Sequence, residues 1–190
     1  MTYQFKIQIK GITKPPVWRR VLVPDTFTFQ QFHFLIQEVF GWENVHLYSF
    51  SEEVYGGSFR ISEPDEMDDC YFIPTKDASK VKLRAYFGKD TSKSLVYWYD
   101  FGDDWMHIIK LELVSDEVLL HPRCLAGKGT CPPEDCGGVG GYEYLKALFR
   151  EDPESEEAQE MREWLGLEED ETWDANYFNL EEANRYLSQL

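Results

Sequence analysis

The segment spanning residues 97–109 holds the densest group of side chains that could do chemistry, with the sequence YWYDFGDDWMHII. Gly102 and Asp103 have the composition of a two-residue type II′ hairpin turn. In that register Asp100 and His107 become diagonal neighbours on the core side of a sheet, about 7–8 Å apart at the backbone. A carboxylate beside an imidazole can orient a general base or support a metal ligand. Alternatively, the two side chains form a hydrogen-bonded pair whose only role is to satisfy buried polar groups at the margin of the sheet. A turn longer by one residue would exchange the two faces of the strand and break the pairing.

A second group of reactive side chains lies in residues 121–141, a stretch rich in proline, glycine and cysteine. Glu134 and Asp135 are adjacent and should diverge, which makes them weaker evidence for acid–base catalysis than two carboxylates that face one another. The same stretch contains a set that zinc would accept: His121, Cys124, Cys131 and Cys136. Their spacing lacks the close Cys-x-x-Cys pairs of a structural zinc site. We therefore expect free thiols and favour no cofactor, with zinc or another divalent ion as the alternative.

A third region supplies His46, which stands between Trp42 and Tyr48 in a segment of polar and aromatic residues. If the three regions meet in the fold, they form one aromatic and acidic pocket. Its candidate residues are His46, Asp100, Asp103, His107, Glu134 and Asp135. Ordinary packing of each region is the alternative. The catalytic residues stay unknown, because the chain contains none of the common nucleophile or metalloprotease motifs.

The elements that must position these residues are mainly strands. Alternating polar and apolar residues or aromatic and β-branched composition mark each of them. The predicted strands are residues 3–10, 17–23, 44–50, 80–87, 94–101 and 105–114. Between the second and third, Thr28 and Gln31 form a capping box, so a helix should begin there and run to Phe40, before Gly41. Three later helices are expected near Tyr142, at Asp152 followed by Pro153, and at Asn179.

These elements predict an α+β fold. Its antiparallel sheet has a β-grasp-like ββαβ start and a central meander, and helices follow at the C-terminal end. We expect one domain over residues 1–190. Within it, residues 1–120 are mainly sheet plus one helix, residues 121–141 are a loop, and residues 142–190 form an acidic helical subdomain.

Charge is unevenly distributed along the chain. The formal net charge is −16, and residues 134–190 hold 17 acidic against 4 basic residues. Such a field repels phosphate backbones, so nucleic-acid binding without a further factor is unfavourable. The expected partner is an unidentified small ligand or protein.

Several features of composition bear on location. No stretch approaches the roughly 18 apolar residues of a membrane span, and the N-terminus has no signal-peptide pattern. Four cysteines without a secretion signal favour thiols over disulfides. We therefore expect a cytoplasmic protein without membrane partners.

Four ordered segments carry a resemblance to a known family. They are Pro16-Val-Trp-Arg-Arg20, Phe40-Gly-Trp42 with His46 and Phe50, Tyr99-Asp-Phe-Gly-Asp-Asp-Trp105 with His107, and Cys131-Pro-Pro-Glu-Asp-Cys-Gly-Gly138 with Gly141 and Tyr142. Together they resemble the plasmid pRiA4b ORF-3-like family over nearly the whole chain. The resemblance implies an α+β fold in a mostly bacterial and archaeal cytoplasmic protein. It implies no activity, although some members carry transposon-passenger or resolvase labels, and it strengthens the loop of Glu134 and Asp135 as a site while weakening zinc.

Two classes of function remain open from the sequence. The leading hypothesis is a binding or interaction module whose aromatic and acidic pocket holds a small ligand, a peptide or a metal ion. The alternative is a metal-dependent hydrolase or nuclease associated with mobile elements, with Asp100, Asp103, His107 and Glu134 around a divalent ion. Whether the protein is an enzyme is left undecided.

Overall fold

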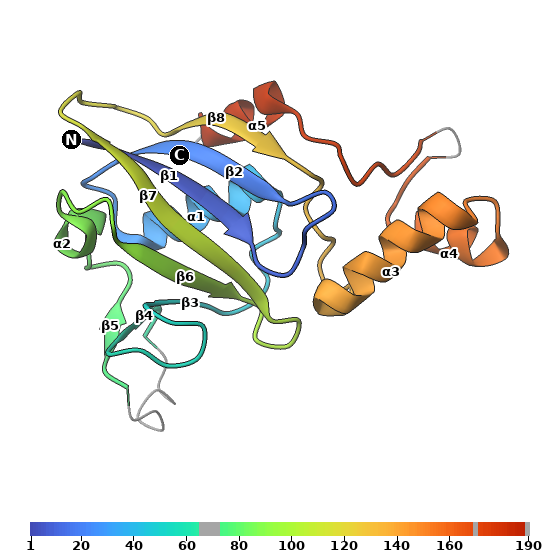
Figure 1. Cartoon of the computed structure of the whole chain (residues 1–190), viewed down its shortest axis with the longest axis horizontal. Helices are drawn as coiled ribbons and strands as arrows, with labels where there is room; N and C mark the ends of the chain where they lie inside the picture. Colours follow the sequence, from blue (N-terminus) through green and yellow to red (C-terminus); the bar gives the residue numbers. More distant parts are fainter. Residues whose placement is uncertain (65–72, 169–170, 189–190) are drawn as a thin grey trace.

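The computed structural model of the 190-residue chain describes residues 1–64, 73–168 and 171–188. Its centre is an eight-stranded sheet in the order β5-β4-β3-β6-β7-β1-β2-β8 (Figure 1). Neighbouring strands are antiparallel except for the parallel pair β4 and β5. The strands are β1 (Thr2–Ile9), β2 (Trp18–Pro24), β3 (Tyr48–Ser51), β4 (Arg60–Ser62), β5 (Thr75–Asp77), β6 (Ser94–Tyr99), β7 (Trp105–Ser115) and β8 (Arg123–Lys128).

Strand β1 shows how the alternating sequence builds one buried face. Tyr3, Phe5 and Ile7 are fully buried, whereas Gln4 and Lys6 between them are half-buried on the opposite face. The buried face packs against α1 (Phe29–Phe40), which crosses one side of the sheet (Figure 1), and the rings of Phe5 and Phe32 lie 5.0 Å apart. Full burial of one such aromatic side chain contributes about 1.5–3 kcal/mol. The aromatic layer between β1 and α1 is therefore the centre of the core.

The predicted helix after the second strand is confirmed as α1, together with both of its ends. The Thr28 hydroxyl accepts a hydrogen bond from the Gln31 amide, and the Gln31 side chain accepts one from the Thr28 amide. The helix ends where Gly41 takes a φ of 95°, in the left-handed region that glycine adopts without strain. The other helices are α2 (Leu83–Phe87), α3 (Gly138–Glu151), α4 (Glu156–Trp164) and α5 (Leu180–Leu187).

The strand predicted for residues 80–87 is wrong, because this segment forms the short helix α2. Its alternating apolar residues include Leu83 and Phe87, which are four positions apart and are both buried on one side of the helix. The segment therefore satisfied the strand and the helix pattern equally well. Without this strand, the predicted meander is reduced to the hairpin of β6 and β7.

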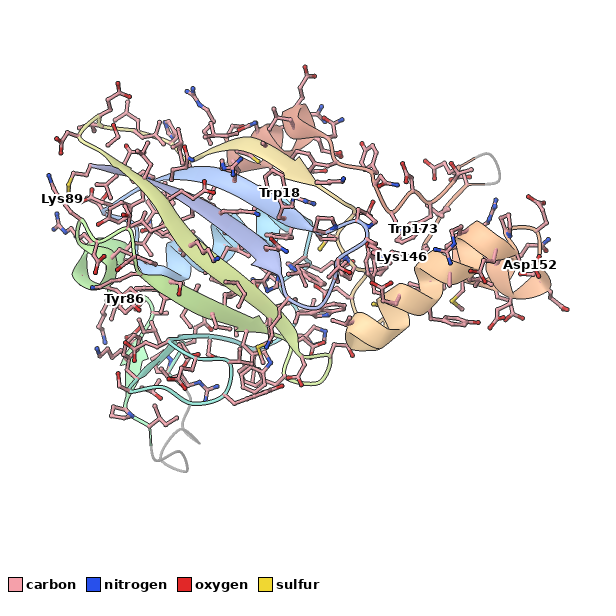
Figure 2. The ribbon with its side chains drawn as sticks, in the orientation of Figure 1. Trp18, Tyr86, Lys89, Lys146, Asp152 and Trp173 are labelled. Carbon is pink, nitrogen blue, oxygen red and sulfur yellow. The ribbon has the colours of Figure 1, made fainter. Side chains whose placement is uncertain are left out.

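The C-terminal helices follow the strands, as predicted, but two of them begin elsewhere than expected. Helix α3 begins at Gly138 instead of near Tyr142, and Ser155 caps α4 in place of Asp152. Asn179 caps α5 as predicted. Trp173, which follows α4, lies against α3 (Figure 2), and its ring centre is 5.7 Å from that of Tyr142.

Strand β8 lies in the stretch expected to be a loop, and α5 packs beside it (Figure 1). The side chain of Asn184 in α5 accepts a hydrogen bond from the Cys124 amide and donates one to the Cys124 carbonyl, at 2.9 and 3.0 Å. These two bonds pair the outer side of β8 with an amide side chain, as a neighbouring strand would.

The fold class is α+β, as predicted, and the chain begins with the predicted order strand, strand, helix, strand. In the sheet, β6 and β7 separate β3 from β1. No helix in the described ranges combines the length and the apolar character that crossing a membrane requires.

The register predicted for the β6–β7 hairpin is wrong by one residue. Tyr97 lies opposite His107, and Tyr99 lies opposite Trp105, so five residues connect the two strands. The amide of Asp104 donates to the carbonyl of Asp100, which closes this wider turn in place of a two-residue turn at Gly102 and Asp103. Asp100 lies in the turn outside the ladder, and His107 faces the core among aromatic rings.

His107 is a buried neutral histidine of the core. Its Nδ1 lies 3.0 Å from the carbonyl oxygen of Trp105, which can only accept, and its Nε2 lies 3.3 Å from the indole N–H of Trp42, which can only donate. Both ring nitrogens are therefore used and one tautomer is fixed. Burial lowers the pKa of His107 from 6.5 to about 4, and it does the same to the pKa of His33.

We predict that these two histidines make the free energy of unfolding depend on pH. Their pKa is near 6.5 in the unfolded chain and about 4 in the folded one, so the unfolded state takes up protons first. Stability should fall as pH decreases from about 6.5 to about 4, by up to about 3 kcal/mol for each histidine. Urea unfolding across this range should show a shallower fall for His107→Phe than for the wild type. The exposed His121→Gln is the control, and an unchanged slope in His107→Phe would contradict the prediction.

Candidate functional site

Four side chains from three separate segments meet at one end of the sheet, where the β6–β7 turn lies close to the start of α3 (Figure 1). The centre of the group is Nε2 of His46, from the segment before β3. Carboxylate oxygens of Asp100 and Glu134 each lie 3.7 Å from this nitrogen, and an oxygen of Asp135 lies 3.3 Å from it. We refer to His46, Asp100, Glu134 and Asp135 as the acidic cluster.

The segment that carries His46 is held by side chains of α1. Gln37 accepts a hydrogen bond from the Asn44 amide at 2.8 Å, and Nε2 of His33 lies 2.7 Å from the side-chain oxygen of Asn44. Asn44 has a φ of 56°, so the chain turns sharply at this residue. The amide of Val45 then donates to the hydroxyl of Tyr99 at 3.2 Å. These contacts direct the following residue, His46, toward the end of β6.

Asp100 is fixed by the wide turn that replaces the predicted hairpin. Its φ is 54°, its amide donates to the carbonyl of Leu47, and its Oδ1 accepts a hydrogen bond from the Gly102 amide. The other carboxylate oxygen, Oδ2, is the one that lies 3.7 Å from His46. Only 9% of the Asp100 side chain is exposed. The turn thus holds a nearly buried carboxylate with one oxygen directed at the imidazole.

Glu134 has one satisfied and one unsatisfied carboxylate oxygen. Its Oε1 accepts hydrogen bonds from the Glu43 amide and the Tyr99 hydroxyl, both at 2.8 Å. Its Oε2 is buried, has no hydrogen-bond partner in the described residues, and lies 3.7 Å from Nε2 of His46, which also has no such partner. The side chain is 10% exposed, and burial raises the pKa of this carboxyl group. Two buried polar atoms therefore face each other without a hydrogen bond, which is costly and uncommon.

The loop before α3 is anchored to the β6–β7 turn by Asp103. The Asp103 side chain accepts a hydrogen bond from the Gly137 amide at 3.0 Å. Gly138 approaches the same turn so closely that a Cβ atom on it would lie 2.6 Å from the carbonyl oxygen of Asp103. These contacts fix the position of Glu134 and Asp135 relative to Asp100.

The structure brings together part of the pocket predicted from sequence. The four residues of the acidic cluster converge, including Glu134 and Asp135, whose side chains were expected to diverge. Both side chains reach the same nitrogen, and Asp135 has a φ of 55°, in the left-handed region. Asp103 instead anchors the loop, and His107 lies in the core with its Nε2 bonded to Trp42. The predicted contact between Asp100 and His107 is absent from the described hydrogen bonds and ion pairs, because the turn is wider than expected.

Sequence reasoning missed Tyr99 and Asn44, which orient the cluster without belonging to it. Tyr99 was expected as part of a strand and of a segment shared with the family, and Asn44 as the start of a strand, and neither was assigned to the site. Asparagine is one of the few residues besides glycine that enters the left-handed region readily. Its position shortly after Gly41 was the available signal for a second sharp turn.

The set His121, Cys124, Cys131 and Cys136 does not gather into a metal-ligand group among the described residues. His121 is exposed, whereas Cys124 is buried and pairs through its backbone with Asn184. Burial raises the pKa of Cys124 to about 11 and that of Cys136 to about 12. Without a bound metal ion these two thiols are therefore protonated near pH 7, and Cys70 lies outside the described residues.

Three members of the acidic cluster, in contrast, have the spacing of metal ligands, and Glu134 is not one of the three. One ligand atom each from His46, Asp100 and Asp135 lies within 4.8 Å of the others, the one such group in the part of the chain that the structure describes. A tetrahedral ion with bonds of about 2.0–2.2 Å holds neighbouring ligand atoms about 3.3–3.6 Å apart. The distances of 3.3 and 3.7 Å around Nε2 of His46 are close to this spacing. Imidazole and carboxylate together suit zinc, manganese or iron.

A cavity of about 370 Å³ adjoins the cluster on the side of His46. Aromatic side chains of Phe34, Tyr48 and Phe101 line it, together with Val45 and Leu47 from the His46 segment. The buried hydroxyl of Tyr48 has no hydrogen-bond partner in the described residues. On the other side, the Asp135 side chain is 73% exposed, so this member of the cluster is in contact with solvent.

We predict that Gly141 and Gly140, which are adjacent in α3, respond oppositely to alanine. A Cβ atom on Gly141 would lie 1.6 Å from the carbonyl oxygen of Cys136, whereas one on Gly140 would meet nothing within 4 Å. Gly141→Ala should lower the free energy of unfolding by more than about 2 kcal/mol because the loop before α3 must move. Gly140→Ala should be neutral or stabilising by up to about 1 kcal/mol. Denaturant unfolding of both variants checks this, and equal stabilities would show that the loop does not pack as described.

Comparisons with known proteins show which family and which solved structure the chain is similar to. The sequence profile of the family described as "Plasmid pRiA4b ORF-3-like protein" matches residues 1–182. The chain is 38% identical over 172 residues to the uncharacterized protein y4hQ of Sinorhizobium fredii, covering 90% of this chain and 84% of that protein. It is also similar to the crystal structure of MM3350, a protein of unknown function from Methanosarcina mazei, with a TM-score of 0.77 and 36% identity over 95% of this chain and 96% of that one. The chain therefore belongs to the plasmid pRiA4b ORF-3-like family.

Proposed function

We propose that the protein is a binding module whose acidic cluster holds a divalent transition-metal ion. The observation that carries the proposal is the pair of buried atoms, Nε2 of His46 and Oε2 of Glu134, that face each other without hydrogen bonds. A cation held by His46, Asp100 and Asp135 would satisfy Nε2 and would lie close to the negative charge of Glu134. It would also offset the repulsion among three carboxylates gathered around one imidazole.

An ion pair of a protonated His46 is the competing account of the cluster. A protonated Nε2 carries one hydrogen, which can be directed at one carboxylate only. The atom instead lies 3.3–3.7 Å from three carboxylate oxygens and donates to none of them. A ligand atom shared by several oxygens at this spacing fits coordination of a common ion better than a directed hydrogen bond.

The backbone around the cluster is consistent with a specialised site. The non-glycine residues with positive φ in the described chain are Asn44, Asp100, Asp104 and Asp135. Two of them belong to the cluster, and Asn44 and Asp104 stand in the segments that present it. Conformations of this kind cost free energy and concentrate at ligand sites.

We predict that zinc or manganese binds and stabilises the protein through the cluster. At a metal concentration a hundred times the Kd, the stability gain is about 3 kcal/mol and appears as a higher Tm. Calorimetric titration and elemental analysis should show one ion per chain. His46→Ala should abolish binding, and Asp100→Asn should weaken it at least about tenfold, because it replaces a charged ligand by a neutral one of the same size.

Two control variants distinguish the acidic cluster from a metal site elsewhere in the chain. Glu160→Gln removes an exposed carboxylate in α4, and Cys131→Ser removes a member of the alternative zinc set. Both should bind the metal as the wild type does. Loss of the ion in Cys131→Ser together with full binding in His46→Ala would assign the metal to the cysteine loop and overturn the proposal.

Metal-dependent hydrolysis is a second candidate function, favoured by the cavity of about 370 Å³ that His46 borders. A substrate in this cavity would lie next to the ion, and an ion with an open position can activate water. Phosphoesters, peptides and nucleic acids should be tested with zinc, manganese and magnesium. Hydrolysis that disappears in His46→Ala supports this function, whereas metal binding without turnover of any substrate class leaves the binding module as the function.

A further inference from the structure

A second cavity, of about 310 Å³, lies between the end of α1, the segment after β8 and the start of α5, away from the acidic cluster. Arg19 of β2 lines it although only 3% of its surface is exposed. Most of the remaining lining is apolar or aromatic, from Phe40, Phe178, Ala183 and the half-exposed Tyr177 and Tyr186. A nearly buried cation in such surroundings is uncommon and requires an explanation.

The guanidinium group of Arg19 is held firmly by backbone carbonyl groups. Its Nε donates to the carbonyl of Val39 at 2.9 Å, and its Nη1 lies 3.0 Å from the carbonyl oxygens of Trp18, Lys128 and Gly129. Nη2 donates no hydrogen bond within the described chain, and it is not among the fully buried unpaired atoms. One nitrogen of the group is therefore left for a further acceptor, and Arg19 lines a cavity that could hold one.

The aromatic rings of Phe40 and Phe178 complete the surroundings of Arg19, with centres 4.9 and 4.4 Å from its guanidinium carbon. Gly127 makes this approach feasible, because a Cβ atom there would lie 2.7 Å from the Phe178 ring and 2.9 Å from Cδ of Arg19. The rings stabilise the cation by their quadrupoles. They do not supply a negative charge.

No carboxylate among the described residues forms an ion pair with Arg19. The acidic groups that interact with it are Cys131, Cys124 and Tyr142. Burial raises the pKa of all three, so they stay neutral near pH 7. Arg19 is thus a buried positive charge that is held by carbonyl groups and aromatic rings but has no ionic counter-charge among the described residues.

We propose that this cavity binds a small carboxylate with an apolar or aromatic body, and that the carboxylate pairs with the guanidinium of Arg19. A planar carboxylate matches the planar guanidinium. The aromatic walls fit an apolar body of the ligand. Glu38 and Glu182 also line the cavity, so anions with several charges, such as phosphate, are repelled more strongly than a single carboxylate.

Benzoate and its neutral isostere benzamide test the role of charge in the full-length protein. In an NMR titration, benzoate should shift the assigned Nε–H signal of Arg19 and the amides lining the cavity, and the shifts should saturate. Benzamide has nearly the same shape without the charge and should leave these signals in place. Equal shifts from both compounds, no saturation, or saturation without any change at Arg19 would each overturn the proposal.

Charge variants give a second readout that does not depend on the folding of an Arg19 variant. Glu38 is exposed, so Glu38→Gln should fold normally and tighten benzoate binding by about two- to fivefold by removing a nearby negative charge. Glu160→Gln, an exposed change outside the cavity, should leave the affinity unchanged. An affinity that responds equally to both changes, or to neither, would contradict binding beside Glu38. Arg19→Met should lower the affinity at least about tenfold if it folds.

His46→Ala separates this site from the proposed metal centre. It should lose the metal and keep the full affinity for benzoate. If benzoate binding were lost with His46, the anion would be a metal ligand and the Arg19 site would be excluded.

Discussion

The hydrogen bond from the Tyr99 hydroxyl to Glu134 joins the sheet to the loop that precedes α3. Tyr99 is fully buried at the end of β6, and burial and Glu134 together raise its pKa, so the hydroxyl remains a donor throughout the physiological range. The same hydroxyl accepts from the Val45 amide, which ties in the segment of His46. One phenol therefore sets the relative positions of all three segments of the acidic cluster. The remaining Glu134 oxygen is directed at His46 as a consequence.

Two histidines of the same chain show how surroundings decide the role of a side chain. Both ring nitrogens of His107 form hydrogen bonds, one with the carbonyl of Trp105 and one with the indole N–H of Trp42. No ring nitrogen of His107 is therefore free to bind a ligand. His46 has its Nε2 among three carboxylates and without a hydrogen bond in the described residues. From sequence, the two were equal members of one candidate pocket. The register of the hairpin places His107 in the core, whereas contacts of Asn44 and Val45 with α1 and Tyr99 place His46 beside the carboxylates.

Local patterns in the sequence predicted those parts of the fold that local interactions determine. The alternation in β1 and the capping box of α1 each involve residues a few positions apart, and both are confirmed. The prediction for the β6–β7 turn was wrong because the shape of the turn depends on the left-handed conformation of Asp100. The Asp100 amide donates to the carbonyl of Leu47, which is distant in sequence. Strand β8 was missed for a similar reason, because its residues pair with β2, which is far away in the sequence. The residue types of the cluster were recognised, but their convergence depends on these same long-range contacts.

The pairing of Asn184 with the backbone of Cys124 has a consequence for behaviour at high concentration. An outermost strand with free amide and carbonyl groups is a template onto which another chain can add, and this is a common route to aggregation. On β8 the amide and carbonyl of Cys124 are already occupied by a side chain of α5. At the other margin, β5 has only three residues and pairs with β4 in parallel. Helix α5 thus helps to keep a long sheet from growing from one molecule into the next.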